Sequence, residues 1–134
     1  LKEESRLVES PYDSLIIGLN ATDRAILYDR INRRVDIMVE MGLVEEAFEL
    51  WQSSPMKTAA NAIGYKELIP YFKKEMSLVE CIDKIKQETR RYAKRQLTWF
   101  RRNDSIEWVV TDDFSKKCEI FEKSEKAIAK YGIM

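Results

Sequence analysis

The sequence predicts a mostly helical α/β domain with two short strands, at about residues 14–19 and 106–111. Each strand is predicted by a short apolar run, SLIIGL in the first case and IEWVVT in the second. The 134 residues include four Gly and three Pro, so few helix breakers interrupt the stretch between the runs. Two short strands are not stable alone. They therefore either pair with each other or belong to a larger sheet whose other strands are missing.

The chain is long enough for one domain with a core, predicted over residues 14–134. Residues 1–13 are predicted to be a loop or the end of an insertion segment. The first strand is nearly continuously apolar, which predicts burial on both of its faces. The chain lacks an initiator Met and opens on charged residues, which is typical of a piece of a longer protein; a processed chain is the alternative.

A helix is predicted between the first strand and about Met41, with Asn20 or Thr22 as its cap and Gly42 ending it. Its apolar face consists of Leu27, Ile31, Val35 and Met38. A second helix is predicted over Leu43 to Gln52. Its core-facing residues are expected to be Val44, Ala47, Phe48 and Trp51.

Residues 58–69 are rich in small side chains and are predicted to be helical, with Pro70 ending or kinking the segment. Gly64 lies inside this segment, where it costs about 1 kcal/mol relative to Ala. We interpret it as the site of a tight helix–helix contact; a seat for a ligand or base is the alternative.

Ser77 and Glu80 form a capping box, which predicts the start of a long helix that runs to about Arg102. A last helix is expected to end near Tyr131, with Asp113 or Ser115 as its cap.

The sequence ETRRYAKRQLTWFRR, residues 88–102, carries six basic residues and one acidic residue in a chain with no net charge. On a helix the basic residues fall within an arc of roughly 140°. They are Arg90, Arg91, Lys94, Arg95, Arg101 and Arg102. Such a strip repels itself unless an anion is present, and it therefore favours a polyanion such as nucleic acid. A solvated helix face is the alternative.

Tyr92, Trp99 and Phe100 fall on the opposite side of this helix. They are candidates for stacking on an unpaired base, but we interpret them as core residues because that side continues the apolar edge of the helix.

Several other classes of site are disfavoured. The chain has no His and only two Cys, Cys81 and Cys118, so a zinc site or an imidazole base is not expected. The acidic pairs Glu45-Glu46 and Asp112-Asp113 are interpreted as surface or cap charges. The chain shows no GxxxxGK[ST] loop and no apolar run long enough for a membrane span. These residues alone supply no complete active site.

Taken in order, these segments resemble the C-terminal part of bacterial tRNA dimethylallyltransferases, also called tRNA isopentenyltransferases, from about Leu15 to Asp112. The resemblance is carried by IIGL (16–19), R-x-x-LYDRINRRVDIMVEMGLVEE (24–46), AIGYKELIPY (62–71) and TRRYAKRQLTWFR (89–101), followed by Trp108.

The resemblance implies a tRNA-modifying enzyme of the cytoplasm, a monomer, with a parallel sheet like that of P-loop kinases and a helical insertion. It implies transfer of a dimethylallyl group from dimethylallyl pyrophosphate to the N6 amine of the adenosine 3′ of the anticodon. It places the P-loop, Mg²⁺ and the catalytic Asp in an N-terminal half that this chain lacks. No catalytic residue or metal ligand is therefore expected in this chain, and we expect it to be inactive alone.

The family's tRNA contacts, carried over by motif, fall on Ala60, Asn61, Ala62, Ile63, Gly64 and Tyr65, and on Ala93, Lys94, Arg95, Gln96, Leu97, Thr98, Trp99 and Phe100. Arg24 and Arg30 are weaker candidates for the pyrophosphate. Asn61 departs from the Gln common in relatives. Lys73-Lys74 replaces a usual Gly before Ser77, so that turn is predicted to differ. A non-catalytic helical RNA-binding module and a structural domain with solvated charges are the alternative functions.

Overall fold

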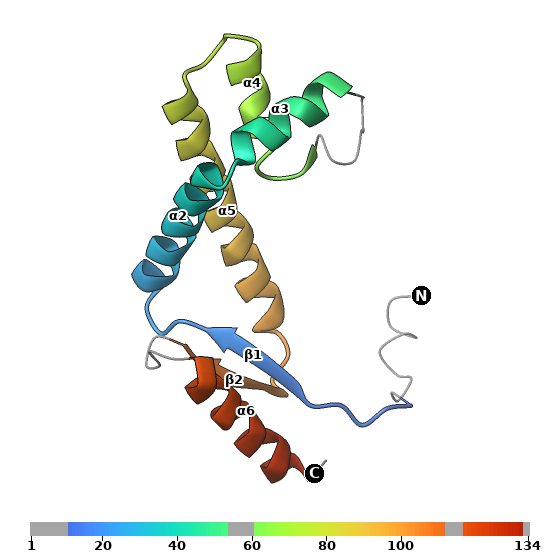
Figure 1. The fold of residues 1–134 in the computed structure, drawn as a ribbon. Coiled ribbons are helices and arrows are strands. Elements are labelled where there is room, and N and C mark those ends of the chain that lie inside the picture. Colours follow the sequence, from blue (N-terminus) through green and yellow to red (C-terminus); the bar gives the residue numbers. More distant parts are fainter. Residues whose placement is uncertain (1–10, 54–60, 112–116, 133–134) are drawn as a thin grey trace. The chain divides into compact units, whose positions relative to one another are not determined.

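The computed structural model describes residues 11–53, 61–111 and 117–132. The elements along the chain are β1 (Ile16–Asn20), α2 (Arg24–Glu40), α3 (Leu43–Ser53), a 3₁₀ turn η2 (Lys66–Leu68), α4 (Ile69–Phe72), α5 (Leu78–Phe100), β2 (Ile106–Val110) and α6 (Lys117–Tyr131) (Figure 1). Contacts group the chain into two compact units, Leu1–Thr22 with Asn103–Met134, and Asp23–Arg102. The prediction of a single domain stays a prediction.

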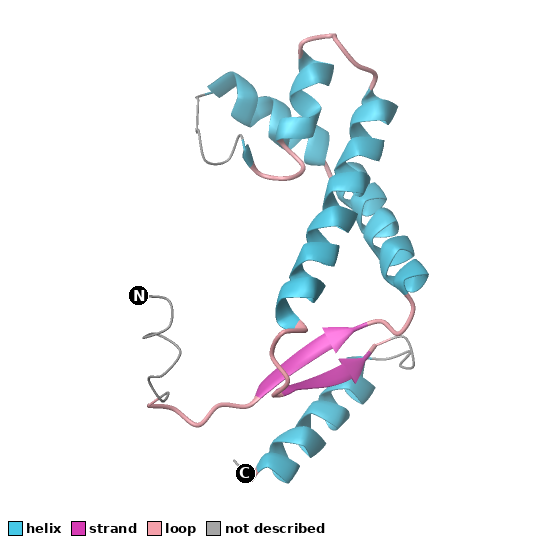
Figure 2. Ribbon diagram, turned by 180° about the vertical axis from the view of Figure 1, so that it is seen from behind, coloured by secondary structure: helices cyan, strands magenta, loops and turns pink. Residues whose placement is uncertain are grey.

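The first unit contains both strands, and they pair with each other in parallel. Their register runs from Ile16 opposite Ile106 to Asn20 opposite Val110. Both predicted strands are thus confirmed, and Figure 2 shows them with α6 alongside. Gly18 permits this pairing, because a Cβ there would lie 2.6 Å from the ring of Trp108, its partner on β2.

The prediction that β1 is buried on both faces is wrong for the described chain. Ile16 is 41% exposed and Leu19 is 57% exposed. On β2, by contrast, Val109 is 2% exposed, and α6 packs against that strand. In the described part of this unit β1 pairs with one strand and has an open edge, so its apolar side chains lack the cover that a larger sheet would give.

The second unit opens with α2, whose cap is Asp23 and not Asn20 or Thr22. The Asp23 carboxylate accepts a hydrogen bond from the Ala25 N–H at 2.9 Å. Asn20 instead ends β1, and its side chain accepts from the Ala21 N–H. Gly42 ends the helix as predicted, with φ of +104°, a conformation that glycine adopts readily.

One apolar cluster holds this unit together, formed by Val35, Leu43, Ala47, Leu68, Cys81 and Ile85. On α2 the cluster uses Val35 and Val39, whereas the predicted core residue Met38 is 36% exposed. Phe48 and Trp51 of α3 lie at its margin, where their ring centroids approach Phe72 to 5.3 and 5.5 Å. Cys81 is buried, Cys118 is exposed and both are free thiols.

The predicted helix over residues 58–69 is wrong for residues 62–65 and holds for residues 66–69. Residues 62–65 form a turn in which Gly64 has φ of +101°, and helical structure resumes at η2 and α4. Pro70 does not end the segment, because it occupies the first turn of α4, where a missing N–H costs nothing.

The capping box of α5 is confirmed. The Ser77 N–H donates to Glu80 Oε2 at 3.0 Å, and the Glu80 N–H donates to Ser77 Oγ at 3.3 Å. The helix then runs antiparallel to α2 (Figures 1 and 2) and ends at Phe100, close to the predicted Arg102. Arg90 donates to the Asn32 side chain at 2.8 Å, and Lys86 pairs with Asp36 at 2.7 Å, so these contacts align the two helices.

Candidate nucleic-acid interface

The C-terminal half of α5 presents a strip of cations of which most lack a carboxylate partner. Arg91 forms an ion pair with Glu88 at 3.0 Å, and Arg90 is half-buried against α2. The other four basic residues are exposed, and among the described residues none of them has a carboxylate within 4.0 Å. These four are Lys94, Arg95, Arg101 and Arg102.

Residues of the strip line two adjoining hollows, both within the Asp23–Arg102 unit. The outer one is open, has a volume of about 430 Å³ and is lined by Arg91, Lys94, Arg95, Thr98, Trp99 and Arg102. The inner one, of about 20 Å³, lies between α2 and α5 and is lined by Arg24, Leu27, Tyr28, Lys94, Leu97, Thr98 and Arg101. Lys94 and Thr98 border both hollows, so they form the ridge between them.

The prediction that the aromatic residues of α5 pack into the core is wrong. Trp99 is 64% exposed, Tyr92 is 47% exposed and Phe100 is 40% exposed. Leu97 and Ala93 are half-buried instead, because α2 crosses this half of α5 on the side of Leu97. Trp99 meets Phe100 edge to face at 5.0 Å, and Arg95 lies over the Tyr92 ring at 5.8 Å. The exposed rings therefore lie beside the cations, an arrangement suited to stacking on bases.

The remaining predicted residues of α5 also reach the surface. Gln96 is exposed, and the exposed Thr98 donates its hydroxyl hydrogen to the Lys94 carbonyl at 2.9 Å, which leaves the oxygen free to accept.

A second group of predicted residues forms the turn before η2. Asn61 and Ala62 are exposed, Ile63 and Tyr65 are half-buried and Gly64 is buried; Ala60 lies outside the described residues. Apart from Gly64 and its two chain neighbours, no atom of the described residues lies within 4 Å of the position of a Gly64 Cβ. The interpretation of Gly64 as a tight helix–helix contact is therefore wrong, and its positive φ accounts for the glycine.

Two glutamates hold this turn: Glu67, which the sequence did not single out, and Glu46, which was interpreted only as a surface or cap charge. The Gly64 N–H donates to Glu67 Oε2 at 2.8 Å, and Glu67 is 6% exposed. The Tyr65 hydroxyl donates to Glu46 Oε1 at 2.8 Å, which raises the pKa of Tyr65. The spacing of a glycine and a glutamate three residues later is a local signal that could have predicted the first bond.

The two arginines predicted to bind pyrophosphate do not converge. Arg24 lines the inner hollow, whereas Arg30 is exposed and lies six residues along α2, about 240° around the helix. Their role stays a prediction.

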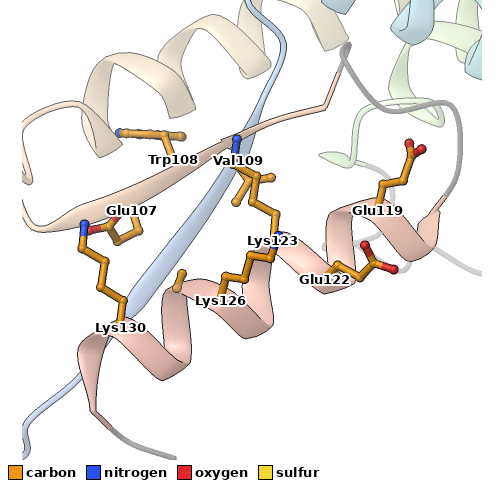
Figure 3. A pocket seen from close by; sticks show the side chains of 9 residues that line it. Glu107, Trp108, Val109, Glu119, Glu122, Lys123, Lys126 and Lys130 are labelled. Carbon is orange, nitrogen blue, oxygen red and sulfur yellow. The ribbon is translucent and has the colours of Figure 1, made fainter.

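The first unit contains a different kind of hollow, of about 560 Å³, between β2 and α6 (Figure 3). It is lined by Glu107, Trp108, Val109, Glu119, Glu122, Lys123, Lys126, Ala127 and Lys130. The lining contains three glutamates and three lysines, so its formal charge is balanced and a polyanion gains nothing there.

Within residues 11–53, 61–111 and 117–132, no three His, Cys, Asp or Glu side chains come together in a way that could hold a metal ion. None of the helices in those ranges has the length and apolar composition of a membrane span. Of the acidic pairs, Asp112-Asp113 lies outside the described residues, and Glu46 is engaged by Tyr65.

These features define an α/β protein whose helical unit carries an exposed surface suited to a polyanion. The profile of the IPP transferase family matches residues 1–103, so the chain belongs to that family. It is 53% identical over 115 residues to the tRNA dimethylallyltransferase of Streptococcus agalactiae, a match that covers 86% of this chain and 38% of the relative. The chain is 51% identical over 122 residues to the tRNA dimethylallyltransferase of Thermoanaerobacter pseudethanolicus. That match covers 90% of this chain and 38% of the relative.

Two solved structures of tRNA isopentenylpyrophosphate transferases are also similar to this chain. The tRNA isopentenylpyrophosphate transferase of Bacillus halodurans matches with a TM-score of 0.81 and 43% identity, over 97% of this chain and 43% of that one. The tRNA delta(2)-isopentenylpyrophosphate transferase of Staphylococcus epidermidis matches with a TM-score of 0.75 and 38% identity, over 94% of this chain and 41% of that one. The chain thus spans about two-fifths of the relatives it matches.

Proposed function

We propose that this chain is the tRNA-contacting portion of a tRNA dimethylallyltransferase. The observation that carries the proposal is the exposed strip on α5, where Lys94, Arg95, Arg101 and Arg102 have no acidic partner among the described residues. Membership of the IPP transferase family and the printed names of the relatives supply the substrate class. RNA phosphates would neutralise the strip, and counterion release would contribute to affinity.

In the proposed reaction, the whole enzyme transfers a dimethylallyl group from dimethylallyl pyrophosphate to the N6 amine of the adenosine 3′ of the anticodon. A base must leave its stack before its exocyclic amine can react. The exposed Trp99 and Tyr92 could stack on a displaced base, while the turn around Gly64 could hold nearby RNA through its backbone and Asn61. The anticodon stem-loop is the proposed RNA partner.

The chemical step is proposed to use groups outside this chain. The family's P-loop kinase-like sheet and Mg²⁺ belong to this proposal, but the described residues gather no acidic cluster that fits a metal ion. We propose that the protein acts as a monomer in the cytoplasm, and that the 134-residue chain alone leaves an anticodon stem-loop unprenylated.

A non-catalytic RNA-binding module is the second candidate function. It is favoured by the fact that the strip, both of its hollows and the turn around Gly64 belong to one compact unit, Asp23–Arg102. A prenyl-transfer assay of the protein expressed from the complete coding sequence separates the two functions, because a binding module would bind RNA without modifying it.

Binding of an anticodon stem-loop to the K94A/R95A double variant tests the role of the strip. Each residue is expected to make a charged contact, so the variant should lose roughly 2–5 kcal/mol of binding free energy. The matched control is K126A/K130A on α6, which removes two lysines from the charge-balanced hollow of the other unit. Equal affinity of K94A/R95A and the unchanged chain would refute the proposal.

A further inference from the structure

We propose that Arg24, Lys94 and Arg101 form a single phosphate-binding subsite where the first turn of α2 meets the last turns of α5. The inference rests on the proposed function, which offers two sources of the phosphate: the tRNA backbone and the pyrophosphate of the prenyl donor. The subsite combines residues for which the sequence predicts different ligands. Arg24 is predicted to bind pyrophosphate, and Lys94 is predicted to bind tRNA.

The geometry of the inner hollow supports a contact with one phosphate. The hollow holds about 20 Å³, the space of a single water molecule. One phosphate oxygen could therefore enter while the rest of the group stays at the mouth among the three cations. The hydroxyl of Tyr28 and the ridge residue Thr98 also line the hollow and offer neutral hydrogen-bond donors or acceptors.

The charges around the hollow are unbalanced. Three cations line it, and no carboxylate from the described part of the chain does. The nearest acidic residue along α2 is Asp23, whose carboxylate is engaged in capping the helix through the Ala25 N–H. Like charges that line one hollow repel, and an anion seated between them would remove that cost.

Arg24 is the residue that distinguishes a subsite from ordinary helix-end charges. Lys94 and Arg101 lie toward the C-terminal end of α5, where cations are favoured by the helix dipole whatever the function. Arg24 lies in the first turn of α2, where the dipole disfavours a cation and where no acidic residue is present. The N–H groups of Ala25, Ile26 and Leu27 already donate to Asp23, so an anion at this position would be attracted by the Arg24 side chain.

The subsite would also extend the basic surface from one helix to two. Because Lys94 and Thr98 border both hollows, an RNA backbone that crosses this ridge could place one phosphate against Arg24 and Arg101 and another against Arg95 and Arg102. The contact would then fix the direction in which the RNA strand crosses α5.

The test compares R24A and R101A with R33A in binding of an anticodon stem-loop across a salt series. Arg33 is the matched control, because it lies about 180° around α2 from Arg24 and pairs with Asp29 at 2.9 Å. We expect R24A and R101A each to weaken binding about tenfold or more. Each should also reduce the slope of log K against log salt by about 1, which a purely structural loss would not do. R33A should match the unchanged chain.

Two further measurements complete the test. R24K keeps the charge and should retain most of the affinity; a loss as large as that of R24A would overturn the subsite, as would unchanged binding by R24A. Inorganic pyrophosphate identifies the source: competition with RNA that R24A abolishes shows that the subsite also accepts the pyrophosphate group of the donor, and absence of competition assigns it to the RNA backbone alone. If K94A/R95A weakens binding and R24A does not, the subsite fails while the proposed function stands.

Discussion

The two halves of α5 differ in what surrounds them. In the first half, Cys81 and Ile85 are 0% and 2% exposed and belong to the apolar cluster, and a capping box anchors the helix at Ser77. In the second half and the two residues that follow it, the aromatic residues and five of the six basic residues are exposed. One continuous helix thus joins a stabilising end to a binding end. Substitutions in the first half should change the free energy of unfolding, and substitutions in the second should change binding.

The largest effect is expected for Ile85→Ala in the buried half. Removing a buried Ile side chain leaves a cavity and should lower the free energy of unfolding by about 2–5 kcal/mol. Urea unfolding followed by circular dichroism measures the change. Val79→Ala is the control, because Val79 lies on the same helix but is 70% exposed, and its effect should stay within about 0.5 kcal/mol. Equal effects of the two would abolish the contrast between the halves.

Local signals account for what the sequence predicted correctly. The capping box at Ser77, the glycine stop at Gly42 and both apolar strands depend on residues close together in the chain, and all are confirmed. The basic strip is also local, because a single helix brings its members to one side.

The errors concern features that depend on where another element crosses. Trp99 lies on the side that continues the apolar edge of α5, yet α2 passes on the side of Leu97 and leaves Trp99 exposed. The position of Arg24 beside Lys94 has the same origin, since the residues are 70 positions apart and meet only through the packing of α2 on α5. Gly64 is predicted to lie inside a helix, but it lies in a turn where its φ is positive.

A smaller effect sharpens the comparison at the turn that leads into α5. Lys74 has φ of +61°, the left-handed conformation that glycine adopts without strain. The prediction that this turn differs from the relatives' turn stays a prediction, but the lysine does occupy a conformation typical of glycine. Lys74→Gly should therefore stabilise the chain by about 0.5–1 kcal/mol.

Lys73→Gly provides the matched control for that change. Lys73 has φ of −81°, an ordinary conformation, so glycine there adds flexibility to the unfolded chain and relieves no strain. Its effect on the free energy of unfolding should have the opposite sign. If both glycines destabilise the chain, the left-handed conformation of Lys74 carries no measurable strain.

The smallest effect is a pH dependence that belongs to the start of α5. Hydrogen bonds from the backbone N–H and the hydroxyl of Ser77 lower the pKa of Glu80 in the folded chain. A carboxylate whose pKa is lower when folded stabilises the protein above its unfolded pKa, about 4.3, and loses that contribution as the pH falls through the folded value. The unfolding free energies of the unchanged chain and E80Q should therefore differ most near pH 7 and converge toward pH 3. A difference that stays constant over this range would mean that the bonds to Ser77 do not favour the ionised form. The stability contributed by this cap would then be independent of the charge on Glu80, while its role in starting the buried half of the helix would remain.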